Sequence, residues 1–136
     1  MTLLIDTNVW LGFYNRGEHQ EKLSGLFLEN DVFISVVTLN EIRRGAHDTF
    51  SKKMYDELRE IFSHYIITPS ELDWIECGNI SERILKNKRR QKNDILLLQN
   101  DILIALCAKK QKAKLVTTDK DFSLLKPYLH IPIEYW

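Results

Sequence analysis

The stretch LLIDTNVWL, residues 3–11, decides the fold of this chain. Its apolar residues Leu3–Ile5 are typical of a buried strand. Between Val9 and Tyr14, apolar side chains then recur with the spacing of a helix. Asp6 lies where the strand runs into the helix, so it either caps the helix or presents a carboxylate for chemistry.

The composition is that of an ordinary globular protein, with 44% hydrophobic and 28% charged residues among 136. We expect one domain over residues 1–136. No apolar run approaches the ~20 residues of a membrane span, and the N-terminus has no export signal, so the sequence predicts a cytoplasmic protein without membrane contacts. The 19 basic and 19 acidic residues balance. A zero net charge does not exclude nucleic acid, because a local basic patch can bind phosphate.

Short apolar runs predict strands along the whole chain, and segments with helical spacing lie between them. This alternation implies right-handed crossovers and a mainly parallel sheet covered by helices on both faces, which is an α/β fold. In such sheets, ligands bind beyond the carboxyl ends of the strands. The predicted strands are Leu3–Ile5, Val32–Ser35, Tyr65–Ile67, Leu115–Thr117 and Ile131–Ile133, and the last long helix is predicted over about Leu97–Gln111.

Two helices have recognisable start signals. Thr38 precedes Glu41 by three residues, which is the spacing of a capping box. Further along, Thr68 is predicted to cap a helix with Pro69 at its first position and Glu71 returning the bond.

Four acids fall at one edge of the predicted sheet. Asp6 and Asp119 each follow a strand, and Glu41 lies just beyond the strand that ends at Ser35. Asp101 interrupts the apolar segment ILLLQNDILIALCA, where an acid is costly to bury unless it faces a partner or water. Each acid alone has a structural explanation, as a helix cap, a capping-box member, a turn residue or part of a polar first turn. Together, at one edge, the four favour a site.

Carboxylates placed together need a cation. A pair roughly 4 Å apart repels by up to about 4 kcal/mol at an effective dielectric constant of 20. Oxygen ligands without Cys or His select a hard ion such as Mg2+ or Mn2+. Such an ion binds phosphates, activates water and stabilises the leaving oxygen of a phosphodiester.

Three segments in this order, LLIDTNVWL, ISVVTLNEIRRGA and NDILIALCAKKQKAKLVTTDKDF, resemble the PIN-domain ribonucleases, and in particular the VapC-type toxins of type II toxin-antitoxin pairs. The resemblance covers nearly the whole chain. It implies a three-layer α/β/α PIN-like fold and Mg2+- or Mn2+-dependent endonucleolytic cleavage of RNA. It also implies a homodimer and inhibition by a cognate antitoxin.

The resemblance also implies roles for individual residues. Asp121 is a further metal-ligand candidate, which the sequence equally allows as a capping partner of Thr118. Asn8 and Thr117 match polar positions that steady the acids or a metal-bound water, and Thr7 matches more weakly. The residues that match the catalytic, metal-holding acids of the family are Asp6, Glu41, Asp101 and Asp119.

The segment LKNKRRQKNDILLLQ before Asp101 is long and basic, where relatives often have a glycine-containing loop. It is either a solvated face or a contact to the RNA backbone. Phosphate contacts give affinity and salt dependence but little sequence choice. The candidate RNA-binding residues are Arg43, Arg44, Lys86, Lys88, Arg89, Arg90 and Lys92.

Other functions remain open from the sequence. The same fold could serve a housekeeping RNA-processing nuclease, or a non-catalytic module that binds RNA or protein. A phosphotransferase with an aspartate nucleophile at Asp6 is disfavoured, because Asn8 stands where that chemistry needs an acid.

Overall fold

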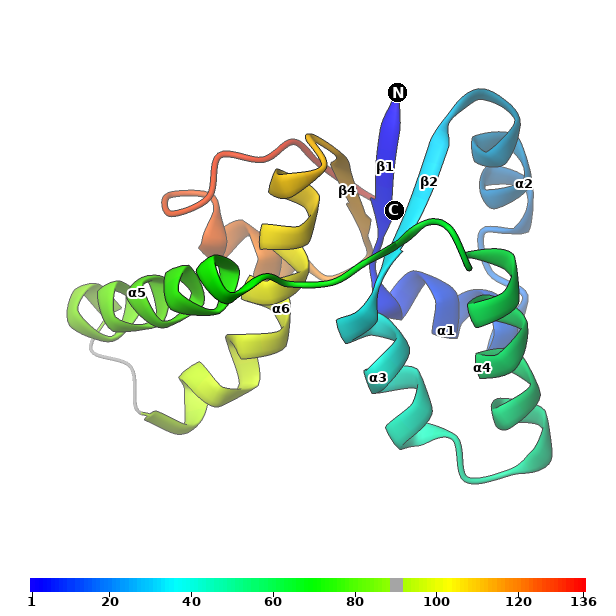
Figure 1. Ribbon diagram of the computed structural model, residues 1–136, viewed down its shortest axis with the longest axis horizontal. Helices are drawn as coiled ribbons and strands as arrows, with labels where there is room; N and C mark the ends of the chain where they lie inside the picture. Colours follow the sequence, from blue (N-terminus) through cyan, green and yellow to red (C-terminus); the bar gives the residue numbers. More distant parts are fainter. Residues whose placement is uncertain (89–91) are drawn as a thin grey trace.

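The computed structural model describes the backbone of residues 1–88 and 92–136 and the side chains of residues 1–87 and 98–136 (Figure 1). Within these ranges, five parallel strands form one sheet in the order β3-β2-β1-β4-β5. The strands are β1 (Thr2–Ile5), β2 (Asp31–Ser35), β3 (Ile66–Ile67), β4 (Lys114–Thr117) and β5 (Ile133–Tyr135). The helices are α1 (Thr7–Arg16), α2 (Gln20–Glu29), α3 (Val36–Gly45), α4 (Thr49–Ile61), α5 (Glu71–Lys88), α6 (Lys92–Lys110) and the 3-10 helix η1 (Lys120–Leu125).

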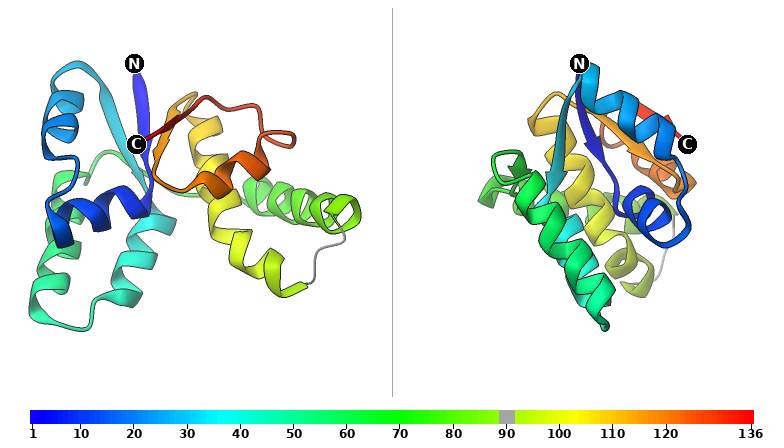
Figure 2. Two further views of the ribbon diagram at one scale, coloured as in Figure 1. Left: turned by 180° about the vertical axis from the view of Figure 1, so that it is seen from behind. Right: turned by 90° about the vertical axis from the view of Figure 1, so that its right-hand side faces the viewer.

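Both faces of the sheet are covered by helices, as Figure 2 shows from two sides. Successive residues of a strand point to opposite faces. Leu4 accordingly packs in a core with α5 and α6, whereas Leu3 and Ile5 pack in a second core with α1 to α4. A parallel sheet buried on both faces explains why its central strands are apolar without interruption. The predicted three-layer α/β/α arrangement is confirmed.

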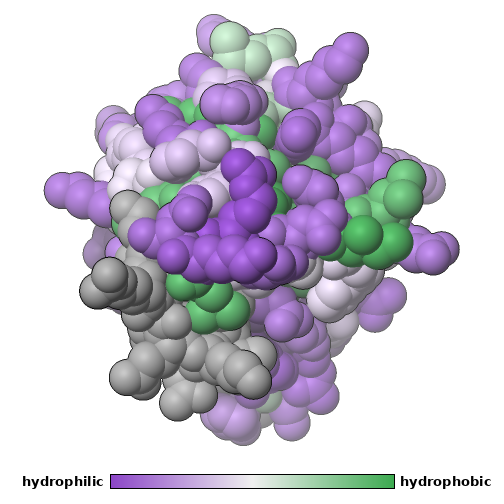
Figure 3. All heavy atoms as spheres, turned by 90° about the vertical axis from the view of Figure 1, so that its left-hand side faces the viewer, coloured by the Kyte–Doolittle hydropathy of each residue, from purple (hydrophilic) through white to green (hydrophobic). Residues whose placement is uncertain are grey.

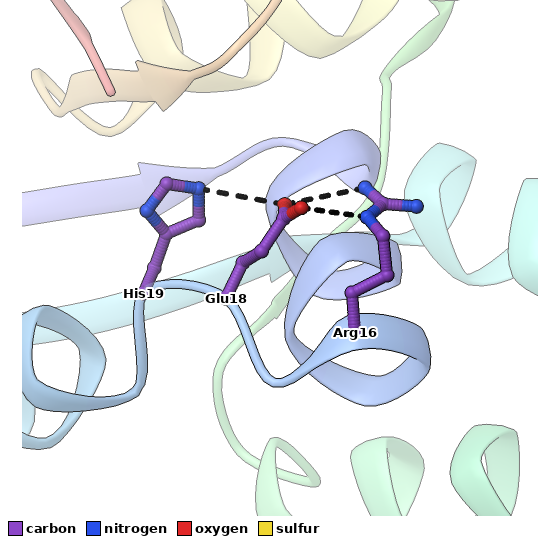
Figure 4. Close-up of polar contacts among 3 residues, drawn as sticks. All are labelled: Arg16, Glu18 and His19. Atoms are coloured by element: carbon purple, nitrogen blue, oxygen red, sulfur yellow. Dashed lines mark hydrogen bonds and ion pairs between the residues drawn. The ribbon is translucent and has the colours of Figure 1, made fainter.

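Polar contacts around Glu18 hold the turn between α1 and α2 (Figure 4). Arg16 Nε donates to Glu18 Oε1 at 2.6 Å, and His19 Nε2 lies 3.9 Å from Oε2 of the same carboxylate. Gly17 and His19 both have left-handed backbone, with φ of 66° and 60°. Because the Arg16–Glu18 pair is exposed to solvent, it directs the path of the turn more than it stabilises the fold.

The helix caps differ from those predicted. Ser35, not Thr38, is the N-cap of α3, and its hydroxyl accepts a hydrogen bond from the Thr38 backbone N–H at 3.0 Å. At the start of α5, Ser70 and Asp73 form a reciprocal pair, with Ser70 N–H donating to Asp73 at 2.7 Å and Asp73 N–H donating to Ser70 Oγ at 3.2 Å. The prediction of Thr68 as the cap was therefore wrong, since Pro69 and Ser70 lie before the helix instead of inside it.

Removing the Ser70 hydroxyl is expected to destabilise the protein by about 1 kcal/mol, the usual effect of losing an N-cap. The matched change Thr68→Ala, two residues earlier at an exposed position, is expected to cost much less. Urea unfolding of Ser70→Ala and Thr68→Ala beside the wild type measures both. Equal stabilities of the two variants would contradict the cap at Ser70.

Two other boundaries also differ from the prediction. The last strand runs over Ile133–Tyr135 and not Ile131–Ile133. The side chain of Ile131 is buried outside the sheet, so its apolar character reflects packing and not strand pairing. Helix α6 begins at Lys92, before the predicted Leu97, and its first turn has the polar sequence Lys92–Asp94. Within the part of the chain that the structure describes, every helix is too short or too polar to cross a membrane.

Candidate functional site

The carboxyl ends of β1, β2 and β4 bring three of the predicted acids to one edge of the sheet. Asp6 directly follows β1, and Asp119 lies two residues beyond the end of β4. Glu41 is in α3, which begins immediately after β2. Because these strands are parallel neighbours, their ends meet at the same edge.

Asp6 is fixed at this edge by hydrogen bonds to β4. Its backbone N–H donates to the Val116 carbonyl at 2.9 Å, and its carboxylate accepts from the Thr117 hydroxyl at 2.8 Å. Asp6 occupies the N-cap position of α1, but its side chain makes no capping hydrogen bond. Burial of the side chain, which is 3% exposed, raises the pKa of the Asp6 carboxyl to about 6, and the charges of Glu41 and Asp119 act in the same direction.

Glu41 is held by a hydroxyl group from α1. Thr7 Oγ1 donates to Glu41 Oε1 at 2.7 Å, and Thr7 Oγ1 also lies 3.1 Å from Thr38 Oγ1. Ser35 Oγ lies 3.1 Å from Thr38 Oγ1 on the other side. Glu41 therefore does not close a capping box with Thr38, as the sequence predicted, and instead contacts the residue that follows Asp6.

Asp119 and Asp121 stand at the start of η1. The Asp119 backbone N–H donates to the Thr117 hydroxyl oxygen at 2.9 Å, and its carboxylate accepts from the Asp121 backbone N–H at 2.9 Å. The capping partner of Asp121 is thus Asp119, not Thr118. Thr117 consequently joins two acids, since its one hydroxyl group donates to Asp6 and accepts from Asp119.

Asp101 comes to the same edge from a different direction, on α6. Burial, together with the charges of Asp6, Asp119, Glu41 and Asp121 in decreasing order, raises the pKa of the Asp101 carboxyl to about 7. Asp101 thus lies within electrostatic range of every other candidate acid. The apolar residues that follow Asp101 are explained by the burial of Ile102 and Leu103 in the core with α5.

The buried polar residues of the described chain all gather at this edge. A core position normally excludes such groups unless a partner satisfies them. Here each of them makes a hydrogen bond within the group or to Glu41 or Asp119. These residues are Asp6, Thr7, Ser35, Thr38 and Thr117.

The chemistry of the site fits a hard cation, because its charged side chains offer oxygen ligands alone. Burial is the main cause of the raised pKa values of Asp6 and Asp101, and the charges of the neighbouring carboxylates raise both pKa values further. Among the described residues, no three His, Cys, Asp or Glu side chains stand close enough to ligate one ion as they are. The carboxylates are at electrostatic range and not at coordination distance.

The remaining predicted residues lie outside this cluster. Asn8 is exposed in the first turn of α1, and Arg43 and Arg44 are exposed in the last turn of α3. Lys86 is an exposed residue of α5 that pairs with Glu82 at 2.7 Å. Figure 3 views the molecule from the end where α5 and α6 lie, and the face is mostly hydrophilic with separate apolar patches. The side chains of Lys88, Arg89, Arg90 and Lys92 lie outside the described residues.

Sequence reasoning did not identify Ser35 and Thr38 as part of the site, although it assigned Thr38 to a cap. The signal that could have found them is the segment ISVVT, in which hydroxyl residues flank two valines at the end of a buried strand. Hydroxyls at such positions need partners, and the nearest acids in the predicted fold were Asp6 and Glu41.

The family model of the PIN domain matches residues 3–126. The chain belongs to the PIN domain family. Proteins of this family are in general nucleases that use divalent metal ions. The resemblance seen in the sequence is thus confirmed over most of the chain. A search of the curated proteins found no match.

Among the solved structures with a similar fold are several toxin-antitoxin complexes. VapBC2 from Rickettsia felis, bound to a DNA fragment from its promoter, matches with a TM-score of 0.75 and 23% identity over 100% of this chain and 99% of that chain. DNA-bound VapBC from Salmonella typhimurium matches with a TM-score of 0.71 and 19% identity over 100% and 98%. VapBC-5 from Mycobacterium tuberculosis matches with a TM-score of 0.65 and 19% identity over 99% of this chain and 98% of that chain. At these identities, the likeness establishes the fold.

Proposed function

We propose that this PIN domain is a Mg2+- or Mn2+-dependent endoribonuclease and the toxin of a toxin-antitoxin pair. The observation that carries the proposal is the gathering of the buried polar side chains around carboxylates whose charges act on one another. A fold that needed only stability would place apolar residues at these positions. Burying charges that repel is a cost typical of functional sites.

In this proposal Asp6, Glu41, Asp101 and Asp119 hold the metal. Asp121, whose charge acts on Asp101, is a further candidate ligand. A bound divalent ion would supply an activated water and stabilise the leaving oxygen of the phosphodiester. Thr117 keeps the carboxylate of Asp6 in place through its 2.8 Å hydrogen bond. Asn8 is exposed beside Asp6 in sequence, where its amide is free to contact water or a phosphate.

We propose that RNA lies across the same edge of the sheet. Arg43 and Arg44 are exposed on α3, the helix that also carries Glu41, and can reach a phosphate backbone that enters the site. On sequence grounds the basic run contributes further phosphate contacts. Its residues are Lys86, Lys88, Arg89, Arg90 and Lys92.

The proposal also includes partners. The solved neighbours are complexes of toxins with antitoxins, which supports a cognate antitoxin for this chain. A homodimer would cover the apolar side chains of α5 that are exposed in the single chain, Leu72, Trp74 and Ile75. Light scattering of the purified chain tests whether it forms this homodimer. A toxin of this kind would act on RNA in the cytoplasm.

The test combines a cleavage assay with growth. Purified protein is expected to cut RNA internally in 5 mM Mg2+ or Mn2+ and to leave it intact in EDTA. Induced expression without the antitoxin is expected to stop growth, and expression of the antitoxin from the adjacent gene to restore it. Mapping the new RNA ends distinguishes internal cleavage from exonuclease digestion.

Other results would favour the alternatives. Metal-dependent cleavage without growth arrest would identify a housekeeping RNA-processing nuclease. RNA or protein binding that is unchanged by metal and by Asp101→Asn, without cleavage, would identify a binding module and overturn the proposed activity.

A further inference from the structure

A line of hydroxyl groups runs through the interior to the carboxylate of Glu41. It begins at Ser35, passes through Thr38 and ends at Thr7, with oxygen–oxygen distances of 3.1 Å at both steps. Thr7 Oγ1 then reaches Glu41 Oε1 at 2.7 Å. Ser35 and Thr38 are 0% exposed and Thr7 is 7% exposed, so these hydroxyls must satisfy one another.

The number of protons fixes the direction of every bond in this line. A hydroxyl group has one proton to donate, and an ionised carboxylate has none. The 2.7 Å contact with Glu41 therefore takes the proton of Thr7, and the 3.1 Å contact with Thr7 must take the proton of Thr38.

The same reasoning extends to the start of the line. Since the proton of Thr38 is committed to Thr7, the remaining 3.1 Å contact takes the proton of Ser35. Ser35 Oγ in turn accepts the Thr38 backbone N–H at 3.0 Å. Each hydroxyl thus donates once and accepts once, and bonds aligned in one direction polarise and strengthen one another.

We propose that Thr7 is a positioning residue for Glu41, and that Thr38 and Ser35 act through Thr7 by fixing the direction of its O–H bond. The inference rests on the proposed function, because it assigns these hydroxyls to the metal-holding carboxylate. The bond from Thr7 is charge-assisted and short, so it holds Glu41 in one rotamer. Outer groups that orient metal ligands in this way affect metal affinity by roughly 10- to 100-fold when they are removed.

The position of Thr7 in the sequence adds a second constraint. Thr7 directly follows Asp6, whose carboxylate is fixed to β4 by Thr117. The dipeptide Asp6-Thr7 therefore contains one acid of the site and donates a hydrogen bond to another, Glu41, which lies 34 residues after Thr7. This arrangement fixes the spacing between the Asp6 and Glu41 carboxylates before any ion binds.

Packing alone does not require these hydroxyls. Valine has the shape of threonine, and replacing both partners of a buried hydrogen bond by apolar groups of the same shape is nearly neutral for stability. The double variant Thr7→Val/Thr38→Val removes both partners of the middle bond but leaves the Ser35 hydroxyl without its acceptor, so it is expected to stay folded with a modestly lower melting temperature. That expectation separates a role in positioning from a role in the core.

The affinity for Mn2+, measured from the electron paramagnetic resonance signal of the free ion, tests the proposal. Thr7→Val is expected to raise the Kd for Mn2+ on the order of tenfold, whereas Thr7→Ser, which keeps the hydroxyl, should stay within about threefold of the wild type. The Kd of Thr38→Val should lie between those of Thr7→Val and Thr7→Ser, because Thr7 keeps the proton that it donates to Glu41. The control Thr68→Val, at an exposed threonine on the same polypeptide, should leave the Kd unchanged.

Two further measurements distinguish positioning from a purely structural role: the melting temperatures of the variants, and the effect of Thr7→Val in a protein that already lacks the Glu41 carboxylate. Ser35→Ala is expected to lower the melting temperature most, because Ser35 also caps α3, yet to affect the Kd for Mn2+ least. In the Glu41→Ala background, which removes the side chain that Thr7 holds, Thr7→Val should have no further effect on the Kd. If losses of affinity follow losses of stability instead, the proposal is overturned.

The outcomes separate this inference from the proposed function. A wild type that binds no Mn2+ overturns both. A wild type that binds Mn2+ as tightly as Thr7→Val does overturns the inference and leaves the proposed function standing. In metal-free protein, NMR should detect hydroxyl protons of Thr7 and Thr38 that exchange slowly with water, and rapid exchange of both would also overturn the inference.

Discussion

Replacing Asp6 with asparagine is expected to lower the rate of Mn2+-dependent RNA cleavage on the order of 10^3-fold without unfolding the protein. Asparagine has the shape of aspartate, and its side-chain oxygen can still accept the Thr117 hydroxyl, so the packing at the end of β1 survives. The change removes the negative charge that a divalent ion needs in its first layer of ligands. Initial rates on a labelled RNA at saturating Mn2+ measure the effect.

The matched control is Asp31→Asn. Asp31 is an exposed acid at the amino end of β2, at the opposite edge of the same sheet. The same chemical change there should leave the cleavage rate within about twofold of the wild type, because surface substitutions away from a site are usually neutral. An Asp6→Asn protein that is folded and cleaves like the Asp31→Asn control would remove Asp6 from the catalytic group.

Much of the fold could be predicted because the burial of a parallel sheet leaves a plain pattern in the sequence. Leu3–Ile5 and Leu115–Thr117 are central strands with both faces covered, and they are predicted within one residue of β1 and β4. The edge strand β5 was predicted two residues too early, because the buried Ile131 gave the apolar signal whereas Glu134 and Tyr135 of the strand are exposed to solvent. Hydrophobic pattern identifies buried strands and is weak for exposed ones.

The site was harder to predict, because proximity in space depends on contacts that no local pattern encodes. The edge position of Asp6 and Asp119 follows from topology alone, since both follow parallel strands. Asp101 lies on a helix, and its charge interaction with Asp6 depends on the angle at which α6 crosses the sheet. The cap at Ser35 was missed because Thr38 gave an equally good signal three residues later.

The carboxyl of Asp101 gives the second large effect, an expected gain in stability when its charge is removed. In the folded protein its pKa is raised to about 7 from the ordinary value of 3.8. The folded state therefore holds a proton that the unfolded state has lost between these pH values, so stability present below pH ~4 is lost as the pH rises to 7. At pH 8 the ionised carboxylate destabilises the metal-free fold.

Asp101→Asn should accordingly stabilise the metal-free protein at pH 8 by roughly 1 to 2 kcal/mol, a figure lowered for the partial exposure of the carboxyl. The gain should vanish at pH 4, where both proteins are neutral at this position. Urea unfolding at the two pH values measures it, with the exposed helical acid Asp56, changed to Asn, as the control that shows no gain. A variant less stable than the wild type at pH 8 would mean that Asp101 is held by favourable bonds and not strained by its neighbours.

Metal should reverse the order of the two proteins. An ion that binds only the folded state stabilises it by mass action, so millimolar Mn2+ is expected to raise the melting temperature of the wild type by several degrees. Asp101→Asn has already lost the repulsion that the ion relieves and one of the oxygens that would hold it, so its melting temperature should stay nearly constant. The wild type would then be less stable than the variant in EDTA and at least as stable in Mn2+. A residue that serves packing alone cannot produce this reversal, because a packing defect lowers stability equally with and without the ion. Equal increases in the melting temperatures of both proteins would place the ion away from Asp101.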